Sequence, residues 1–370
     1  MYKAYKFRIY PNKAQEQQIE QTFGNCRFVY NYYLNKRIEL YRETKSNFNS
    51  NSCSKDLTQL KKLEEYKWLN LTDSTAYQNA LGDLQNGYDK FFKEHTGFPK
   101  FKRKNNSYQS YTSKNNTNKN NTSSIRILDN NHIQLPKLKK VKCRISRVIT
   151  GRIVNATISK VPSGKYFVSI CCKEDIQPKM KTGSVVGLDL GIKEFCIDSN
   201  GSKIDNPKYL RKSEKKLARL QRQLSRKSIG SKNRNKARIK VAKCYEHITN
   251  QRKDFLQKLS TQIISENDII CLEDLNVKGM VKNHHLAKSI SDCSWSAFTR
   301  MLLYKADWYD KKIVKIDRFF PSSKTCSCCG HRIDKMPLNI REWDCPECNT
   351  HHDRDINAAI NILNEGLKLV

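Results

Sequence analysis

The chain has 370 residues, enough for several modules, and carries 69 Lys and Arg against 36 Asp and Glu, a formal charge of +33. A surface this basic repels itself unless a polyanion neutralises it, so we expect nucleic acid as a partner. No apolar run approaches the roughly 20 residues of a membrane span, and the first residues lack the features of a signal peptide. We therefore expect a cytoplasmic protein without a membrane partner.

The N-terminal part of the chain is predicted to be a strand followed by helices. Residues 1–10 alternate polar and apolar side chains and stop at Pro11, which predicts a short strand. Asn12 and Gln15 have the spacing of a capping box, so a helix is expected to begin there. Apolar residues then recur at helical spacing, and we predict a helical recognition module over residues 11–96. Three tyrosines of its first helix could stack on bases or pack in the core: Tyr30, Tyr32 and Tyr33.

Residues 97–181 have a different composition. The stretch 97–131 is basic, contains Gly and Pro, and becomes rich in Asn, Ser, Thr and Lys, which favours a flexible or nucleic-acid-ordered loop. Residues 125–172 have the pattern of strands, with a hairpin signal at Pro162-Ser163-Gly164. We therefore predict a small, wedge-like β-barrel that the N-terminal strand could join. Candidate nucleic-acid contacts in the basic stretch are Lys100, Lys102 and Arg103.

Residues 182–370 alternate strand and helix patterns, which is typical of an α/β domain. One apolar strand carries Asp189, a second runs into Glu273, and a helix begins near Asp353 and Asp355. Singly, these acids could be a strand-end residue, a turn cap and a helix N-cap. Together, in a basic chain, they favour a Mg²⁺ or Mn²⁺ site, because hard cations prefer carboxylate oxygens. Two such ions about 3.5–4 Å apart can clamp the reacting oxygens of a phosphodiester.

Four of the 14 cysteines form two pairs with the spacing of a zinc ribbon: Cys326 and Cys329, then Cys345 and Cys348. This spacing is a strong signal for a site with four thiolate ligands. Four protein ligands leave no open coordination position, so we predict a structural Zn²⁺ in a ribbon over residues 320–350. Cys328 is then a spare thiol. A redox dithiol is disfavoured because two such pairs occur together.

Residues 208–265 are predicted to form two long basic helices, separated at Ser228-Ile229-Gly230-Ser231. Residues 211–243 hold fourteen Lys or Arg and a single acid, Glu214. The alternative, a solvated charged face, normally mixes both signs of charge. We therefore expect these helices to grip a nucleic-acid backbone. The candidate contacts are Arg219, Arg222, Arg226, Lys232, Arg234 and Lys236.

Several motifs together resemble those of the TnpB (OrfB) family. They are Phe98-Pro99-Lys100-Phe101-Lys102, Gly187-Leu188-Asp189-Leu190-Gly191, Leu272-Glu273-Asp274-Leu275, Ser322-Ser323-Lys324-Thr325-Cys326 and Asp353-Arg354-Asp355-Ile356-Asn357-Ala358-Ala359. The resemblance covers nearly the whole chain. TnpB proteins are encoded by transposons and are related to the type V CRISPR effector nucleases.

The resemblance implies a multidomain α+β protein in which residues 182–370 form a RuvC-like nuclease domain of the RNase H fold, with the zinc ribbon inserted. It implies that Asp189 and Glu273 are the first two catalytic acids, and we choose Asp355 over Asp353 as the third. The implied function is RNA-guided DNA endonuclease. Its implied partners are a guide RNA from the same element, double-stranded target DNA beside a short flanking motif, and a separate transposase encoded nearby. The resemblance also implies a bacterial or archaeal protein associated with the nucleoid.

The alternative function is a catalytically silent or non-guided nucleic-acid-binding regulator of transposition. It would explain the charge and the cysteine pairs but not the three acids. An Asp-Asp-Glu transposase is disfavoured because the acids follow the order Asp, Glu, Asp. A tyrosine transposase is disfavoured because its His-hydrophobe-His pair is missing.

Overall fold

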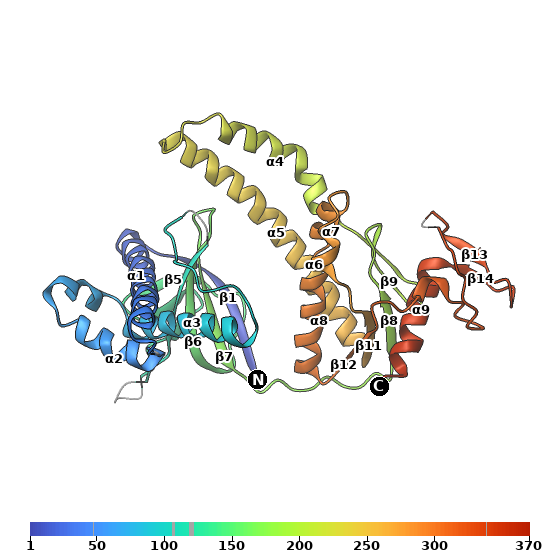
Figure 1. The fold of residues 1–370 in the computed structure, drawn as a ribbon, viewed down its shortest axis with the longest axis horizontal. Helices are drawn as coiled ribbons and strands as arrows, with labels where there is room; N and C mark the ends of the chain where they lie inside the picture. The colour runs from blue at the N-terminus through green and yellow to red at the C-terminus, as the bar shows by residue number, and fades with distance from the viewer. Residues whose placement is uncertain (47, 106–107, 118–121, 338) are drawn as a thin grey trace. The chain divides into compact units, whose positions relative to one another are not determined.

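Two units make up the chain in the computed structural model, Met1–Asp175 and Ile176–Val370 (Figure 1). The structure describes residues 1–46, 48–105, 108–117, 122–337 and 339–370. Three predictions reach residues outside these ranges: the helical module (47), the loop (106–107 and 118–121) and the ribbon (338). The finer division of the chain at residues 10, 96 and 181 stays a prediction.

The helices of the first unit cover part of its sheet and share one apolar core with it. They are α1 (Lys13–Thr44), α2 (Ser50–Leu60), the 3-10 helix η1 (Glu64–Leu71) and α3 (Ser74–Lys93). Helix α1 begins at the predicted capping box. The Asn12 side chain accepts a hydrogen bond from the Gln15 amide at 2.9 Å, and the Gln15 side chain accepts one from the Asn12 amide at 3.1 Å.

The sheet of the first unit is antiparallel and has the order β2-β6-β7-β1-β5-β4-β3. Its strands are β1 (Tyr2–Tyr10), β2 (Gln109–Lys114), β3 (Arg126–Asp129), β4 (His132–Leu135), β5 (Lys139–Arg144), β6 (Arg152–Lys160) and β7 (Tyr166–Lys173). The N-terminal strand β1 joins this sheet between β7 and β5, in line with the sequence. The predicted closed barrel is not found within the described ranges, because β2 and β3 are the two edges of the sheet and pair only with β6 and β4.

The prediction of a loop over residues 97–131 was wrong at β2, which lies within it. Strand β3 lies in the part of this stretch where the strand pattern of residues 125–172 had already begun. The sequence of β2 does not predict a strand because most of its residues are polar, and only Tyr111 and Ser113 of the strand are buried. Polar pairs hold it in place instead: the Thr112 and Thr157 hydroxyls lie 2.8 Å apart across the β2–β6 pair.

The sheet of the second unit is mixed and has the order β10-β9-β8-β11-β12. Its strands are β8 (Val185–Asp189), β9 (Glu194–Asp198), β10 (Lys203–Asp205), β11 (Ile269–Glu273) and β12 (Lys312–Ile316). Strands β8, β11 and β12 run parallel, while β9 and β10 are added as antiparallel strands at one edge. Strand β11, which is paired on both sides, has apolar side chains on both faces, as expected for a strand covered above and below.

Helices cover both faces of this second sheet (Figure 1). Helices α5 (Lys232–Glu266) and α8 (Trp295–Tyr309) pack on one face, and α9 (Arg354–Leu367) packs on the other. The unit also contains α4 (Tyr209–Ser225), which packs against α5, and the short helices α6 (Val277–Met280) and α7 (Ala287–Cys293). Ile270 and Leu272 of β11 share a core with α5 and α8, whereas Cys271 between them packs with Ile362 of α9. None of the helices in the described part of the chain is long and apolar enough to cross a membrane.

The segment between β12 and α9 contains little regular structure. It holds the 3-10 helix η2 (Ser322–Lys324) and a hairpin of β13 (Glu342–Asp344) and β14 (His351–Asp353). Strand β14 leads directly into α9 without a connecting loop. The position of this hairpin is therefore tied to the first turn of α9.

Candidate functional site

The parallel pairing of β8 and β11 brings two of the predicted acids together at the carboxyl ends of these strands. Gly187 is paired with Cys271 and Leu188 with Leu272. The next residue of each strand is acidic, and successive side chains alternate between the faces of a strand. Asp189 therefore points to the same face as Gly187, and Glu273 to the same face as Cys271. That face is the one covered by α9.

Helix α9 supplies the third acid from its first turn. Asp189, Glu273 and Asp355 all line one open pocket of about 880 Å³. The pocket also has basic lining residues, among them Lys288 and Arg341. The tertiary structure thus brings together three acids that are separated by about 80 residues each along the chain, since 189, 273 and 355 differ by 84 and 82.

The environment of Asp189 and Glu273 disfavours the ionised form of their carboxyl groups. Burial raises the pKa of Asp189 to about 7, and the charges of Glu273 and Asp355 act in the same direction. Burial also raises the pKa of Glu273, against the effect of the hydrogen bond that Ser322 Oγ donates to Glu273 Oε1 at 2.7 Å. A bound divalent cation would offset the cost of keeping these groups charged. These carboxylates could hold a hard divalent cation such as Mg²⁺ or Mn²⁺.

Asp353 and Asp355 differ in what their carboxylates do. Asp353 is the N-cap residue of α9. Its Oδ1 accepts hydrogen bonds from the backbone amides of Asp355 and Ile356 at 3.0 and 3.1 Å. Its Oδ2 lies 2.6 Å from Lys203 Nζ. Asp355 faces the pocket, where Arg341 Nη1 lies 3.2 Å from Asp355 Oδ2. The helix-cap function that the sequence offered as an alternative thus belongs to Asp353.

Two residues at the pocket have contacts that the sequence did not predict. Ser322 fixes one oxygen of Glu273, and Arg341 contacts Asp355 from the loop before β13. The only signal at Ser322 in the sequence was the family resemblance of its motif. Arg341 carried no signal, because one more arginine among 69 basic residues is not distinctive.

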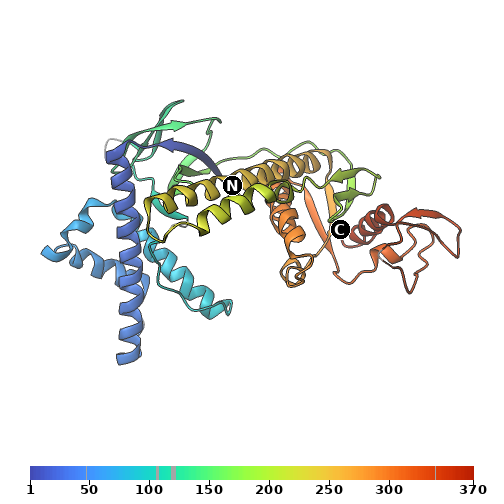
Figure 2. The same cartoon turned by 90° about the horizontal axis from the view of Figure 1, so that it is seen from above.

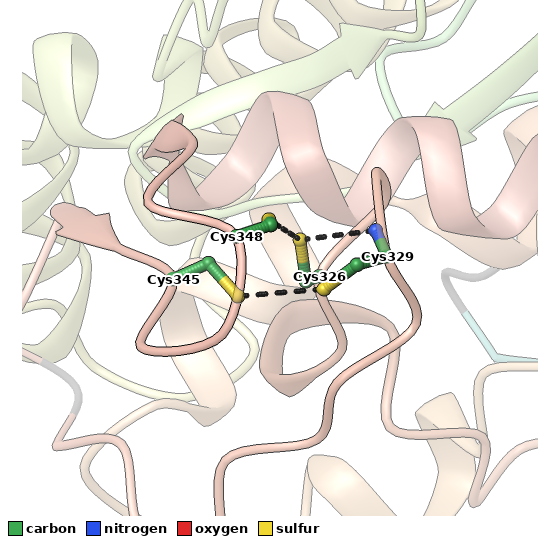
Figure 3. Close-up of side chains that lie close together, drawn as sticks. All are labelled: Cys326, Cys329, Cys345 and Cys348. Carbon is green, nitrogen blue, oxygen red and sulfur yellow. Dashed lines mark hydrogen bonds between the residues drawn. The ribbon is translucent and has the colours of Figure 1, made fainter.

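The four predicted cysteines converge at the turn of the β13–β14 hairpin (Figure 3). Their ligand atoms all lie within 4.8 Å of one another, with Cys326 Sγ 3.6 Å from Cys348 Sγ and Cys329 Sγ 3.5 Å from Cys345 Sγ. A tetrahedral Zn²⁺ with bonds of about 2.3 Å separates its sulfur ligands by about 3.8 Å. The arrangement therefore fits a zinc ion. Cys328 is exposed and stands outside this cysteine cluster.

The predicted basic helices form an antiparallel pair, α4 and α5 (Figures 1 and 2). A small apolar seam holds them together, including Leu217, Val241 and Ile248. Five of the six predicted contacts are exposed to solvent: Arg219, Arg222, Arg226, Lys232 and Lys236. Arg234 differs from them. Its guanidinium donates hydrogen bonds to the carbonyls of Leu224 at 3.0 Å and Lys227 at 2.8 Å, so it stabilises the end of α4.

The predicted contacts of the first unit are also exposed, at Lys100, Lys102 and Arg103. Lys102 is held by its surroundings: its Nζ lies 3.5 Å from Asp83 Oδ2 and 4.1 Å from the centre of the Tyr30 ring. The base-stacking alternative for Tyr30 and Tyr33 was wrong, because these side chains are buried in the core. Tyr32 packs against the same core and is partly exposed.

The chain is similar in sequence to known proteins and family models, and these similarities identify its family. Three family models match the chain: "Probable transposase" over residues 169–284, "Cas12f1-like, TNB domain" over 295–362 and "Helix-turn-helix domain" over 1–46. A Streptomyces pristinaespiralis protein named "Putative RNA-guided DNA endonuclease" is 39% identical over 368 residues, 99% of this chain and 89% of that protein. A mimivirus protein named "TnpB-like protein L79" is 31% identical over 38% of this chain and 28% of its own length. The chain belongs to the TnpB family.

One further relative supports the same placement, and one solved structure shares the fold. The Escherichia coli K12 protein "Putative RNA-guided DNA endonuclease InsQ" is 30% identical over 98% of this TnpB chain and 92% of its own. The Cas12f1 protein of a cryo-EM structure of a Cas12f1–sgRNA–target DNA complex matches with a TM-score of 0.60 and 14% identity, over 98% of this chain and 99% of that one. At this identity the second likeness concerns the fold alone.

Proposed function

We propose that this TnpB chain is an RNA-guided DNA endonuclease of a transposable element, which cuts guide-matched DNA beside a short flanking motif. The observation that carries the proposal is that Asp189, Glu273 and Asp355 line one pocket although they come from two strands and a helix. The relatives that align over nearly the whole chain supply the substrate class through their names. The net charge of +33 agrees with RNA and DNA as partners. A transposase encoded nearby is part of the same proposal.

The second unit is, in this proposal, an RNase H-like core of the RuvC type. Its support is the strand order β10-β9-β8-β11-β12 with three parallel strands, together with an acid at the end of each of the two adjacent strands β8 and β11. In open α/β sheets, ligands bind outside the carboxyl ends of the strands. Asp189, Glu273 and Asp355 line a pocket at the carboxyl ends of β8 and β11.

The carboxylates of Asp189, Glu273 and Asp355 would hold Mg²⁺ or Mn²⁺, which supplies charge neutralisation at the phosphodiester and an activated water. The surrounding residues keep these oxygens in place. Ser322 orients Glu273 through its 2.7 Å hydrogen bond, and Asp353 fixes the start of α9 and with it Asp355. The half-exposed Arg341 beside Asp355 is suited to contact a phosphate that enters the pocket.

The cysteine cluster would hold a structural Zn²⁺. All four ligands come from the protein, and they join two loops that have little regular structure of their own. A metal that clamps such loops contributes directly to their folding. The exposed basic side chains of the α4–α5 pair would contact the phosphate backbone of RNA or DNA.

The test is to express the chain with the DNA that flanks its gene, sequence any RNA that co-purifies, and incubate the complex with a matching duplex and Mg²⁺. Cleavage is expected for the natural chain and is expected to disappear in Asp189→Ala. A matched control is Asp205→Ala, which removes an exposed carboxylate of the same sheet that does not line the pocket. It should cut normally.

The outcomes separate the parts of the proposal. Cleavage that survives in Asp189→Ala would exclude the carboxylate site as the catalytic centre. Cleavage without any bound RNA would leave a plain nuclease. Bound RNA without cleavage would favour the binding-only regulator.

A further inference from the structure

Two asparagines on one face of α9 bind the backbone that leads into the cysteine cluster. Asn357 Nδ2 donates to the Thr325 carbonyl at 2.8 Å, and Asn357 Oδ1 accepts from the Ser327 amide at 2.9 Å. One turn later, Asn361 Nδ2 donates to the carbonyls of Ser322 at 2.8 Å and Thr325 at 2.6 Å. Cys326 is therefore flanked on both sides by residues whose backbone α9 holds.

Both asparagine side chains are almost fully buried, with 1% of Asn357 and 5% of Asn361 exposed. A backbone group that loses its hydrogen-bond partner while shielded from water is destabilised. The Cys326 segment therefore cannot move away from α9 without leaving polar groups unpaired on both sides. Helix and segment should move as one piece.

The same segment reaches the carboxylate site. Ser322, whose carbonyl is held by Asn361, donates its hydroxyl to Glu273. Asp355 is on α9 itself, two residues before Asn357. A single hydrogen-bonded path thus runs from Thr325, the residue before Cys326, through Asn361 and Ser322 to Glu273. The helix that anchors this path carries Asp355.

The second half of the cysteine cluster is joined to α9 as well. Cys345 and Cys348 lie in the turn that connects β13 to β14, and β14 continues into α9. Within β14, His352 is buried and its Nε2 lies 3.0 Å from Cys326 Sγ. The Cys326 segment is thus linked to α9 by hydrogen bonds, and the Cys345–Cys348 turn is linked to the start of α9 by the chain itself through β14.

We propose that Asn357 and Asn361 are positioning residues that make metal binding at the cysteine cluster and at the carboxylate site mutually dependent. With zinc bound, the Cys326 segment is fixed, Ser322 holds Glu273, and Glu273 keeps its place relative to Asp355. With zinc removed, the Cys326 segment loses its link to Cys345 and Cys348. Because the asparagines join this segment to α9 and to Ser322, Asp355 and Glu273 are then no longer fixed relative to each other. This inference rests on the proposed carboxylate site, but not on guide RNA or on DNA cleavage.

Linkage makes the effect reciprocal: if Zn²⁺ raises the affinity for Mg²⁺ by some factor, Mg²⁺ raises the affinity for Zn²⁺ by the same factor. Couplings between sites commonly amount to about 5–150-fold. We expect saturating Mg²⁺ to lower the apparent dissociation constant for zinc by about fivefold or more. If an asparagine had only a structural role, its substitution would change the zinc affinity by the same factor with and without Mg²⁺.

The experiment measures zinc occupancy of the full-length protein at equilibrium, by elemental analysis, across a series of chelator-buffered zinc concentrations with and without saturating Mg²⁺. In the natural chain Mg²⁺ should shift the curve to lower zinc. Asp189→Ala should abolish the shift, which assigns the Mg²⁺ effect to the carboxylate site. Asn361→Ala and the milder Asn361→Ser should bind zinc with no dependence on Mg²⁺, and Asn357→Ala should behave in the same way.

The matched control is Asn267→Ala. Asn267 is a buried amide of the same unit that donates to Ile263 at the end of α5, away from the cysteine cluster. Its removal should leave the Mg²⁺ shift intact. An unchanged zinc curve for the natural chain in Mg²⁺, or an undiminished shift in both Asn361 variants, would overturn the inference. The zinc measurement contains no nucleic acid, so its outcome does not depend on guide RNA or on DNA cleavage. A separate cleavage assay shows whether the proposed function holds.

Discussion

Gly187 of β8 lies directly against Ala359 of α9: a Cβ atom on Gly187 would stand 2.1 Å from the Ala359 carbonyl oxygen and 2.7 Å from the Leu363 amide. Gly366 repeats the relationship farther along α9, where a Cβ would lie 2.4 Å from Cys271 Sγ. Two glycines therefore allow α9 to approach the sheet more closely than side chains would permit. This close approach places Asp355 over the ends of β8 and β11.

Gly187→Ala is expected to destabilise the second unit by about 1–3 kcal/mol, the usual cost of adding atoms to a packed core, and to reduce cleavage as α9 shifts. Tryptophan fluorescence in urea would measure it, because three of the four tryptophans lie in this unit, at 295, 308 and 343. Gly82→Ala in α3 is the control. A Cβ there meets nothing within 4 Å, so this substitution should be neutral or stabilising.

The two acids at the start of α9 should respond differently to substitution. Asp355→Asn should abolish cleavage with little change in stability, because it removes a carboxylate oxygen that faces the pocket. Asp353→Ala should cost about 1 kcal/mol because α9 loses its N-cap, and it should retain measurable cleavage. Thermal melts and cleavage assays on both variants provide the measurement. A folded Asp353→Ala that cuts nothing, beside an active Asp355→Asn, would reverse the assignment.

The zinc ligands can be distinguished from their neighbour by single substitutions. Cys329→Ser should greatly reduce bound zinc, because it removes one of four ligands, whereas Cys328→Ser should leave zinc content and melting temperature unchanged. Elemental analysis of the purified proteins measures the zinc. Loss of zinc in Cys328→Ser would show that the first pair of ligands is not Cys326 and Cys329.

Lys305 should give the second unit a stability that rises at high pH. Its amine is buried between α8 and α5 and donates to Ser260 Oγ and Thr261 Oγ1, both at 2.7 Å. Burial lowers the pKa of Lys305 from 10.5 to about 8. A folded-state pKa below the unfolded one means that the charged amine opposes folding at low pH, and this cost is progressively removed as pH rises from about 8 to 10.5.

Urea midpoints measured across that pH range would test the sign. Lys305→Met should lose this contribution, so its midpoint should rise less with pH than that of the natural chain. Lys240→Met, at an exposed position of α5, should keep the natural pH dependence. An identical slope in Lys305→Met and the natural chain would contradict the prediction.

Substitutions of the basic residues of α4 and α5 should have two different effects, one on nucleic-acid binding and one on stability. Alanine at Arg219, Arg222 and Arg226 should lower the slope of log affinity for nucleic acid against log salt by about 1 for each phosphate that is no longer bound. Arg234→Ala should instead destabilise the α4–α5 turn, because the Leu224 and Lys227 carbonyls lose their donor, and should leave the slope nearly unchanged. Filter binding over a salt series measures both. Equal slopes for the triple variant and the natural chain would exclude these arginines from the interface.

The sequence by itself determined those features whose physics is local. The capping box at Asn12 predicted the start of α1, and the break at residues 228–231 predicted the division between α4 and α5. The spacing of the four cysteines predicted their cluster, because a metal site of this kind needs two short loops with ligands two residues apart. Apolar strands that each contain or end in an acid indicated Asp189 and Glu273.

Only the tertiary structure decided features that depend on contacts between distant residues. The polar strand β2 forms because its hydroxyl and amide groups find partners on β6, and no apolar pattern predicts it. Tyr30 and Tyr33 enter the core because α2 and α3 fold over α1. The choice between Asp353 and Asp355 depends on where a helix begins relative to a sheet. Sequence shows that both are acids near one helix end, but only packing at Gly187 and Gly366 places one of them in the pocket and leaves the other as the cap.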